Sequence, residues 1–349
     1  MIMMRRFLAA AIAALIVGLP AGTAFPVGNG TQAGSFLLIG NGTRATAMGE
    51  AFTGLADDVT AASWNVAGLA QLPSLQASLS YAAWFADTSY SVISAGAPVA
   101  PDNVLAATLY YFHVPRIANV PDDVEPGVDL SNYAVGASYA FRLYDRFCLG
   151  AGLKLMNQDI TQSGRPSTAA AGAMVDLGFL YIHDDPQVSA GVALQNMGPK
   201  LDFRDSSSPA PFWARIGAAY RAYHDEWLQV TGTFDAAEPV DTGYSLDVPE
   251  GGIAEFYKIR IRRPYQNRYN YGFGAECWIA DVLALRGGYT VRVGSDISSP
   301  SAGAGLKFTF EPLVYSVDYS YSYWGDLSPN VSRVSLSISL RPRPSETAE

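Results

Sequence analysis

The segment Leu313–Trp324 has the sequence LVYSVDYSYSYW, in which bulky apolar residues alternate with small or acidic ones. Leu, Tyr and Val occupy the odd positions from 313 to 323, whereas Ser and Asp occupy the even positions from 316 to 322. A period of two is typical of a β-strand that has one apolar and one polar environment. The segment is also long enough to cross a bilayer, which takes about 9–11 residues of a tilted strand.

The same alternation occurs in three further segments: Tyr269–Ile279, Ala302–Glu311 and Ser332–Leu340. A soluble β-sandwich would also alternate, with its apolar face in the core. However, tight joins such as Leu143–Arg146 take turns with longer ones such as Met197–Pro211, which is typical of outer-membrane barrels. The sequence therefore predicts an all-β fold, an antiparallel up-and-down transmembrane β-barrel of about 14 strands. It occupies residues 74–341, and residues 342–349 form a tail.

Charged side chains decide which face of each strand points inward. An Arg or Lys that faces lipid at the membrane midplane costs about 2–4 kcal/mol, so the charged face must line the lumen. The predicted lumen-facing residues are Arg142, Lys154, Asp176, Arg215, Glu276, Arg286, Lys307, Asp318 and Arg333. We expect these groups to pair with one another, with Glu311 or with the plug, because enclosed charges are normally paired.

The two cysteines provide a second test of the strand faces. The alternation places Cys148 inside the barrel and Cys277 outside it. A disulfide needs the two Cα atoms within about 7 Å of each other. The sequence therefore predicts that these cysteines do not form a disulfide.

The segment before the barrel has a different character. Residues 41–72, NGTRATAMGEAFTGLADDVTAASWNVAGLAQL, are rich in Ala and Gly and show no period of two. Ala45, Met48 and Phe52 recur at helical spacing, which predicts two short helical turns inside the barrel, within a lead-in and hatch over residues 25–73. The predicted plug residues are Arg44, Met48, Phe52, Asp57, Asp58, Trp64, Asn65 and Gly68. We interpret one of the two aspartates as the cap of the turn Val59–Trp64, rather than the pair as catalytic acids.

The N-terminus predicts export. Arg5 and Arg6 precede the apolar run Phe7–Leu19, and the small residues Gly22–Ala24 follow it, as in a cleaved signal peptide over residues 1–24. The apolar run is shorter than the ~20 residues of a spanning helix. Together with the barrel pattern, the signal peptide predicts that the protein is located in the outer membrane of a Gram-negative-type envelope. A net charge of −9 argues against binding to nucleic acid.

Catalytic and metal-binding patterns have little support. The three histidines lie far apart, and the sequence contains neither a Gly-x-Ser-x-Gly elbow nor a His-Glu-x-x-His pair, so we predict no enzyme, no cofactor and no metal. An acidic cluster, Asp122, Asp123, Glu125 and Asp129, offers oxygen ligands for calcium, but its spacing differs from that of an EF-hand. The charged loop Ala236–Asn267 is either a solvated external loop or a docking surface, and the sequence leaves both open.

Several motifs carry a family resemblance. The hatch motifs are Gly42, Arg44–Ala45, Met48–Gly49, Ala51–Phe52, Ala56–Asp58, Ala61, Trp64–Asn65 and Ala67–Ala70, and the barrel motifs include Leu194–Lys200, Leu285–Tyr289 and Gly303–Phe308. Together they resemble the PorV/PorQ family of FadL-like outer-membrane barrels, over nearly the whole chain that follows the signal.

The resemblance implies two functions of different classes. In the first, which we favour from the sequence, hydrophobic small molecules pass the hatch and leave through a lateral opening. In the second, a PorV-like adaptor binds exported proteins and delivers them to secretion machinery for surface attachment. The implied partners are outer-membrane lipid, a hydrophobic small molecule, and exported cargo or subunits of the secretion machinery.

Overall fold

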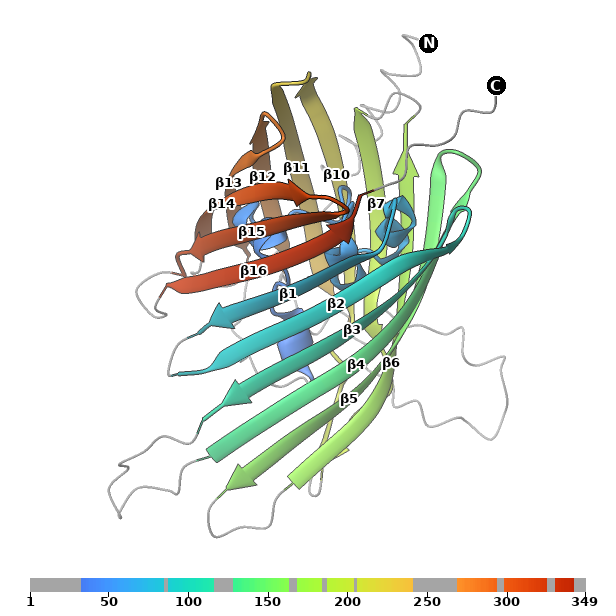
Figure 1. Cartoon of the computed structure of the whole chain (residues 1–349). Helices are drawn as coiled ribbons and strands as arrows, with labels where there is room; N and C mark the ends of the chain where they lie inside the picture. The colour runs from blue at the N-terminus through green and yellow to red at the C-terminus, as the bar shows by residue number, and fades with distance from the viewer. Residues whose placement is uncertain are drawn as a thin grey trace.

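The computed structural model describes residues 33–84, 87–115, 128–162, 168–183, 187–203, 206–240, 269–293, 298–324 and 330–341. Within these ranges, fourteen antiparallel strands close into one barrel (Figure 1). The first strand pairs with the last, from Gln76 opposite Ser339 to Ala83 opposite Ser332. The predicted fold class is therefore confirmed. In the described part of the chain, no helix is long and apolar enough to cross a membrane.

The barrel strands are β1 (Gln76–Ala83), β2 (Ser89–Ala100), β3 (Asn103–Val114), β4 (Val128–Leu143), β5 (Phe147–Gln162), β6 (Thr168–Ile182), β7 (Val188–Met197), β10 (Trp213–His224), β11 (Leu228–Pro239), β12 (Asn270–Ile279), β13 (Leu283–Arg292), β14 (Ser298–Phe310), β15 (Leu313–Ser322) and β16 (Val331–Leu340). Two short strands, β8 (Leu201–Phe203) and β9 (Ser206–Ser208), form a separate hairpin between β7 and β10. We call the end of the barrel with the short joins, such as that between β14 and β15, the turn end. The opposite end is the loop end.

The two faces of the wall match the prediction from alternation. On β15, Val317 and Tyr319 are 42% and 47% exposed on the outer face, whereas Asp318 between them is 6% exposed. The same contrast holds on the other strands, where large apolar side chains lie outside. Cys148 is buried inside the barrel, whereas Cys277 lies on the outer face of β12. Neither cysteine forms a disulfide. A belt of exposed apolar side chains suits contact with lipid.

The hatch lies inside the barrel (Figure 1). Its residues 41–72 contain three short helical segments, where the sequence predicted two: α2 (Thr43–Ala47), η2 (Val59–Ser63) and η3 (Val66–Gln71). A further segment, η1 (Ser35–Leu38), lies in the lead-in. Capping explains part of the difference. Asp58 accepts a hydrogen bond from the backbone of Thr60 at 2.9 Å and begins η2, while Asn65 accepts from the backbone of Ala67 at 3.2 Å and begins η3. The predicted aspartate cap is thus Asp58.

Two apolar clusters fill the lumen. The first, which we call the hatch core, joins buried hatch residues such as Met48, Phe52, Trp64 and Leu69 to the wall. The second cluster lies nearer the loop end and includes Phe36, Tyr90 and Leu201. Leu201 brings in the β8–β9 hairpin, because its side chain packs against Gly172 on the inner face of β6. The loop between Met197 and Pro211 therefore folds partly into the barrel.

Glycines on the inner wall allow the hatch backbone to lie directly against the strands. A methyl group at any of them would come within 3.0 Å of a hatch atom. They are Gly150, Gly178, Gly191, Gly217, Gly272, Gly274, Gly288 and Gly303. The hatch contributes Gly54, whose methyl group would lie 2.5 Å from the Cα atom of Ala218 on β10. Contact at this distance leaves no room for a side chain at position 54.

Gly54→Val should therefore lower the thermal stability of the folded barrel, because overpacking against a backbone typically costs about 1–3 kcal/mol. Heat-dependent migration on denaturing gels, which separates folded from unfolded barrels, measures the transition temperature. Gly287→Ala is the control, since a methyl group there has no atom within 4 Å. Equal transition temperatures for the two variants would contradict the close fit of the hatch.

Candidate functional site

The hatch is attached to the wall by a network of ion pairs centred on Arg44. Its Nε and Nη2 atoms donate to the carboxylate of Glu276 on β12 at 2.8 and 2.7 Å. Its Nη1 atom donates to Asp57 at 2.6 Å and to Asp58 at 3.1 Å, both within the hatch. The guanidinium of Arg44 thus joins Asp57 and Asp58, which directly precede η2, to the barrel wall.

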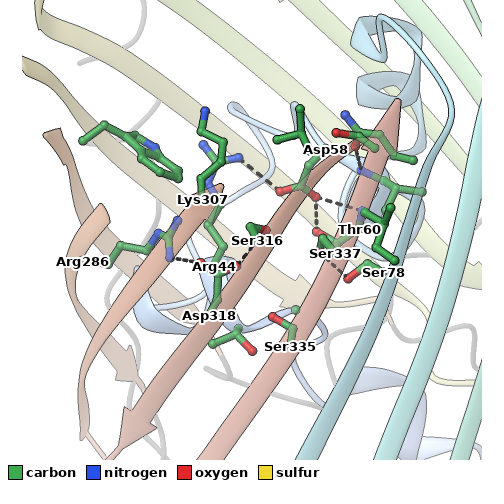
Figure 2. A pocket seen from close by; sticks show the side chains of 18 residues that line it. Arg44, Asp58, Thr60, Ser78, Arg286, Lys307, Ser316, Asp318, Ser335 and Ser337 are labelled. Carbon is green, nitrogen blue, oxygen red and sulfur yellow. Dashed lines mark hydrogen bonds and ion pairs between the residues drawn. The ribbon is translucent and has the colours of Figure 1, made fainter. Parts of the chain in front are cut away.

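The network continues along the wall. Arg286 on β13 donates to Glu276 at 2.7 Å. Arg286 also pairs with Asp318 on β15 (Figure 2). Glu276 is 3% exposed and lies between two guanidinium groups. Removing charges from water costs several kcal/mol for each ion, and paired geometry of this kind is what offsets the cost. Plug residues and lumen residues predicted separately thus form one cluster.

Burial and neighbouring charges shift the pKa of Arg44 in opposite directions, and the same is true of Asp57. Burial raises the pKa of Asp57, and the adjacent Arg44 only partly offsets this effect. Burial lowers the pKa of Arg44, but the carboxylates of Asp57 and Glu276 outweigh it and raise the pKa above its ordinary value. Arg44 therefore remains charged under all ordinary conditions.

A cavity of about 160 Å³ lies beside this network, between the hatch and the wall. Figure 2 shows that polar side chains of the hatch and of several strands converge on it. The lining includes Arg44, Asp58, Thr60, Gln76, Ser78, Ser316, Asp318, Ser335, Ser337 and Ser339. Val59, Trp278, Val314 and Ile338 add apolar surface, so the lining of the cavity is mixed in character.

Further hydrogen bonds join the hatch to strands β11 and β7. Asp235 on β11 accepts from the backbone amides of Phe52 and Thr53 and from the Thr53 hydroxyl. Gln195 on β7 donates to the backbone carbonyls of Ser63 and Trp64, and its side-chain oxygen accepts from Arg215 at 2.8 Å. The prediction omitted Asp235 and Gln195. Alternation could have found Asp235, because the outward Phe234 precedes it.

The other predicted lumen residues differ in their surroundings. Lys154 pairs with Asp176 at 2.7 Å, and both are buried. Arg142 and Lys307 lie near the turn end, where they pair with Asp102 and Asp281. Arg333 is 3% exposed, and no ion pair joins it to a carboxylate among the described residues.

Two expectations need correction, and two others concern residues outside the described ranges. Glu311 is exposed and pairs with Arg341 at the turn end, so it does not face the lumen as expected. Ala236–Pro239 belong to β11 and not to a loop, because they pair with β10, and residues 241–268 lie outside the described residues. The described ranges also exclude the acidic residues Asp122, Asp123 and Glu125, the side chain of Asp129, and the predicted signal peptide over residues 1–24. The described residues contain no group of three or more side chains that could hold a metal ion.

The closed barrel with its internal hatch has the same fold as FadL-like outer-membrane barrels of known structure. Solved structures share this fold: the Ralstonia pickettii toluene transporter TbuX is 13% identical, with a TM-score of 0.56 over 87% of this chain and 99% of that one. The CymD monoaromatic hydrocarbon channel is 13% identical, with a TM-score of 0.57 over 86% and 97% of the two chains. A Pseudomonas aeruginosa FadL homologue is 12% identical, with a TM-score of 0.53 over 93% and 100%.

The family model for the type IX secretion system protein PorV matches residues 28–238, and the chain therefore belongs to the PorV family. No curated protein matches the chain. The predicted family, the location in the outer membrane and the absence of enzymatic activity agree with this membership. Identities of 11–13% to the solved transporters establish the fold alone.

Replacing Arg44 should destabilise the folded protein. In Arg44→Met, Asp57, Asp58 and Glu276 lose their shared cation, and breaking a buried ion pair typically costs about 3–5 kcal/mol. Guanidinium titration of the protein in lipid vesicles measures the free energy of unfolding. Lys307→Met is the control, because its ion pair with Asp281 is exposed and such pairs contribute at most about 1 kcal/mol. Equal losses in the two variants would contradict a special role for Arg44.

Trp64→Ala and Asn65→Ala should raise ion conductance across a planar bilayer without preventing assembly. Trp64 lies in the hatch core, and Asn65 donates to the carbonyls of Thr53 and Phe179, so either change loosens the plug against the wall. Trp227→Ala makes the same change at an exposed turn and should leave conductance unaltered. A plug that seals the lumen is ruled out if the Trp64 and Asn65 variants conduct no more than the parent protein.

Proposed function

We propose that this protein is a secretion adaptor of the outer membrane, which binds exported proteins and delivers them to the machinery that attaches them to the cell surface. Membership of the PorV family supports this function. Of the two functions that the sequence left open, family membership favours the secretion adaptor over the passage of hydrophobic molecules. Outer-membrane lipid surrounds the apolar outer face, and exported proteins with subunits of the secretion machinery are the proposed partners.

The observation that carries the proposal is the filled lumen. The hatch residues Met48, Phe52 and Leu69 are completely buried, and polar contacts fix the hatch to β12, β11 and β7 of the wall through Glu276, Asp235 and Gln195. A conduit for substrates needs a path through or beside such a plug. An adaptor needs only a stable barrel that presents its outer surfaces to partners.

Passage of hydrophobic small molecules is the second candidate. Its support is the fold shared with a toluene transporter and a monoaromatic hydrocarbon channel. Serine hydroxyls and charged groups form part of the lining of the cavity beside the hatch, and this part weighs against the passage of apolar molecules. An apolar molecule there would separate these groups from water without replacing their hydrogen bonds, at a cost of about 1–3 kcal/mol for each group.

Mass spectrometry of the native complex tests the two candidates. The protein is purified from its own outer membrane in mild detergent, beside an unrelated barrel as control, and both proteins and lipophilic small molecules are identified. We expect exported proteins in near-stoichiometric amounts. A bound hydrocarbon without any protein partner would overturn the adaptor function in favour of uptake.

The join between β11 and β12 offers a variant for the same experiment. Ala237 pairs with Asn270, so a short linker in place of most of residues 241–268 preserves the register of the two strands. If this charged segment is a docking surface, the shortened variant should fold, as heat-dependent gel migration would show, and should lose its exported proteins. Unchanged recovery would place the docking surface elsewhere on the protein.

A further inference from the structure

The cavity beside the hatch network contains a buried hydroxyl group that has no partner. Thr43, the first residue of α2, lines this cavity and is 1% exposed. Its side-chain hydroxyl forms no hydrogen bond with any of the described residues. A buried polar group without a partner costs about 1–3 kcal/mol, and a molecule in the cavity that forms a hydrogen bond with Thr43 would remove this cost.

The cavity can be reached from the turn end of the barrel. Gln76 and Ser339, which are paired at the turn ends of β1 and β16, are half-buried. Further along the same strands, the lining residues Ser78 and Ser335 are only 5% exposed. Exposure of the lining therefore decreases from the turn end toward the hatch, which closes the inner end of the cavity with residues such as Thr43.

The charged groups of the lining already have partners. Arg44, Arg286 and Lys307 all form ion pairs with carboxylates. Two carboxylates, those of Asp58 and Asp318, belong to the same lining. An anion in the cavity would be repelled by these carboxylates, and a cation would be repelled by the guanidinium groups. The balance of charge therefore favours a neutral ligand.

The uncharged polar groups favour a ligand with several hydroxyl groups. Ser335, Ser337 and Ser339 line the cavity from β16 (Figure 2), and each serine hydroxyl can both donate and accept hydrogen bonds. Gln76 accepts from the backbone amide of Val59 at 3.2 Å through its side-chain oxygen, so its NH2 group remains as a donor. The apolar part of the lining offers contact to C–H groups. Hydroxyl groups on a short carbon skeleton match both kinds of surface.

We propose that this cavity binds a small neutral polyol, of about the size of a single sugar ring. Its volume of about 160 Å³ corresponds to about five water molecules, since each occupies ~30 Å³ in the liquid. The hydroxyl groups of a sugar donate to and accept from the serines of β16 and Thr43 of the hatch. Its C–H groups lie against Val59, Val314 and Trp278.

Two sources can supply this chemistry: a free monosaccharide, or the terminal sugar of a glycan chain at the turn end. The site goes beyond the adaptor function and does not depend on it. Absence of exported proteins from the purified complex would leave the sugar site untouched. Absence of sugar binding would leave the adaptor function untouched.

A ligand-observed NMR titration of the whole protein tests the site, in a detergent that carries no sugar groups. Glucose is the probe, while glucuronate and glucosamine carry a negative and a positive charge on the same ring. We expect glucose to bind and both charged sugars to bind at least about tenfold more weakly, because their charge would be buried without a partner. Absence of glucose binding, or equal or tighter binding of either charged sugar, would overturn the proposal.

Variants of the lining locate the binding. Thr43→Val removes one hydroxyl and should weaken glucose binding roughly two- to tenfold, as for one lost hydrogen bond. Ser337→Leu fills the half-buried part of the cavity and should abolish binding. Thr233→Val is the control: its hydroxyl is also buried without a partner among the described residues, but it lies on β11, outside the lining, and binding should be unchanged. Normal glucose binding by both Thr43→Val and Ser337→Leu, when both are folded on heat-dependent gels, would also overturn the proposal.

A titration with maltotriose distinguishes the two sources. The cavity has room for one ring, so a glycan can enter only by its end while the other rings remain outside the turn end. Tighter binding of maltotriose than of glucose, lost in Ser337→Leu, assigns the site to the end of a glycan chain. Equal or weaker binding of maltotriose assigns the site to free monosaccharides.

Discussion

The structure depends on direct contact between the hatch backbone and the glycines of the wall. A barrel of this size encloses more space than its own inward side chains fill, and a void would forfeit packing energy on every side. Glycines such as Gly274 and Gly288 bring the strands against Met48 and Gly49 of the hatch, at distances that exclude even a methyl group. Gly49 adopts a φ of 64°, a conformation that side chains disfavour, which adds a second reason for glycine at this contact.

Close backbone contact determines where the polar groups must lie. Once the hatch lies against the wall, its amides and charged side chains are removed from water and need partners on the strands. Asp235 serves the backbone of Phe52 and Thr53, and Glu276 serves Arg44. Each of these wall groups faces inward because it alternates with an outward apolar neighbour. Packing and polar pairing therefore fix the same position of the hatch.

The alternation predicted the barrel because the period of a strand is a local property. It also predicted the inward direction of Glu276, Arg286 and Asp318, since each follows from its immediate neighbours. Their partners could not be predicted, because Arg44 and Glu276 are 232 residues apart and meet only when the hatch is docked. The β8–β9 hairpin was missed for a similar reason. Its three-residue strands are too short for a periodic pattern, and its position depends on Leu201 packing against β6.

The two halves of the lumen differ in how completely their polar groups are satisfied. Around Arg44 the charges are arranged in pairs, and a plug held in this way resists displacement. Around Arg333 and Tyr90, donors remain without acceptors in the described residues. Buried groups of this kind lower stability. The charged groups that fix the plug are thus paired within the protein, whereas Arg333 and Tyr90 nearer the loop end keep buried donors that have no acceptor among the described residues.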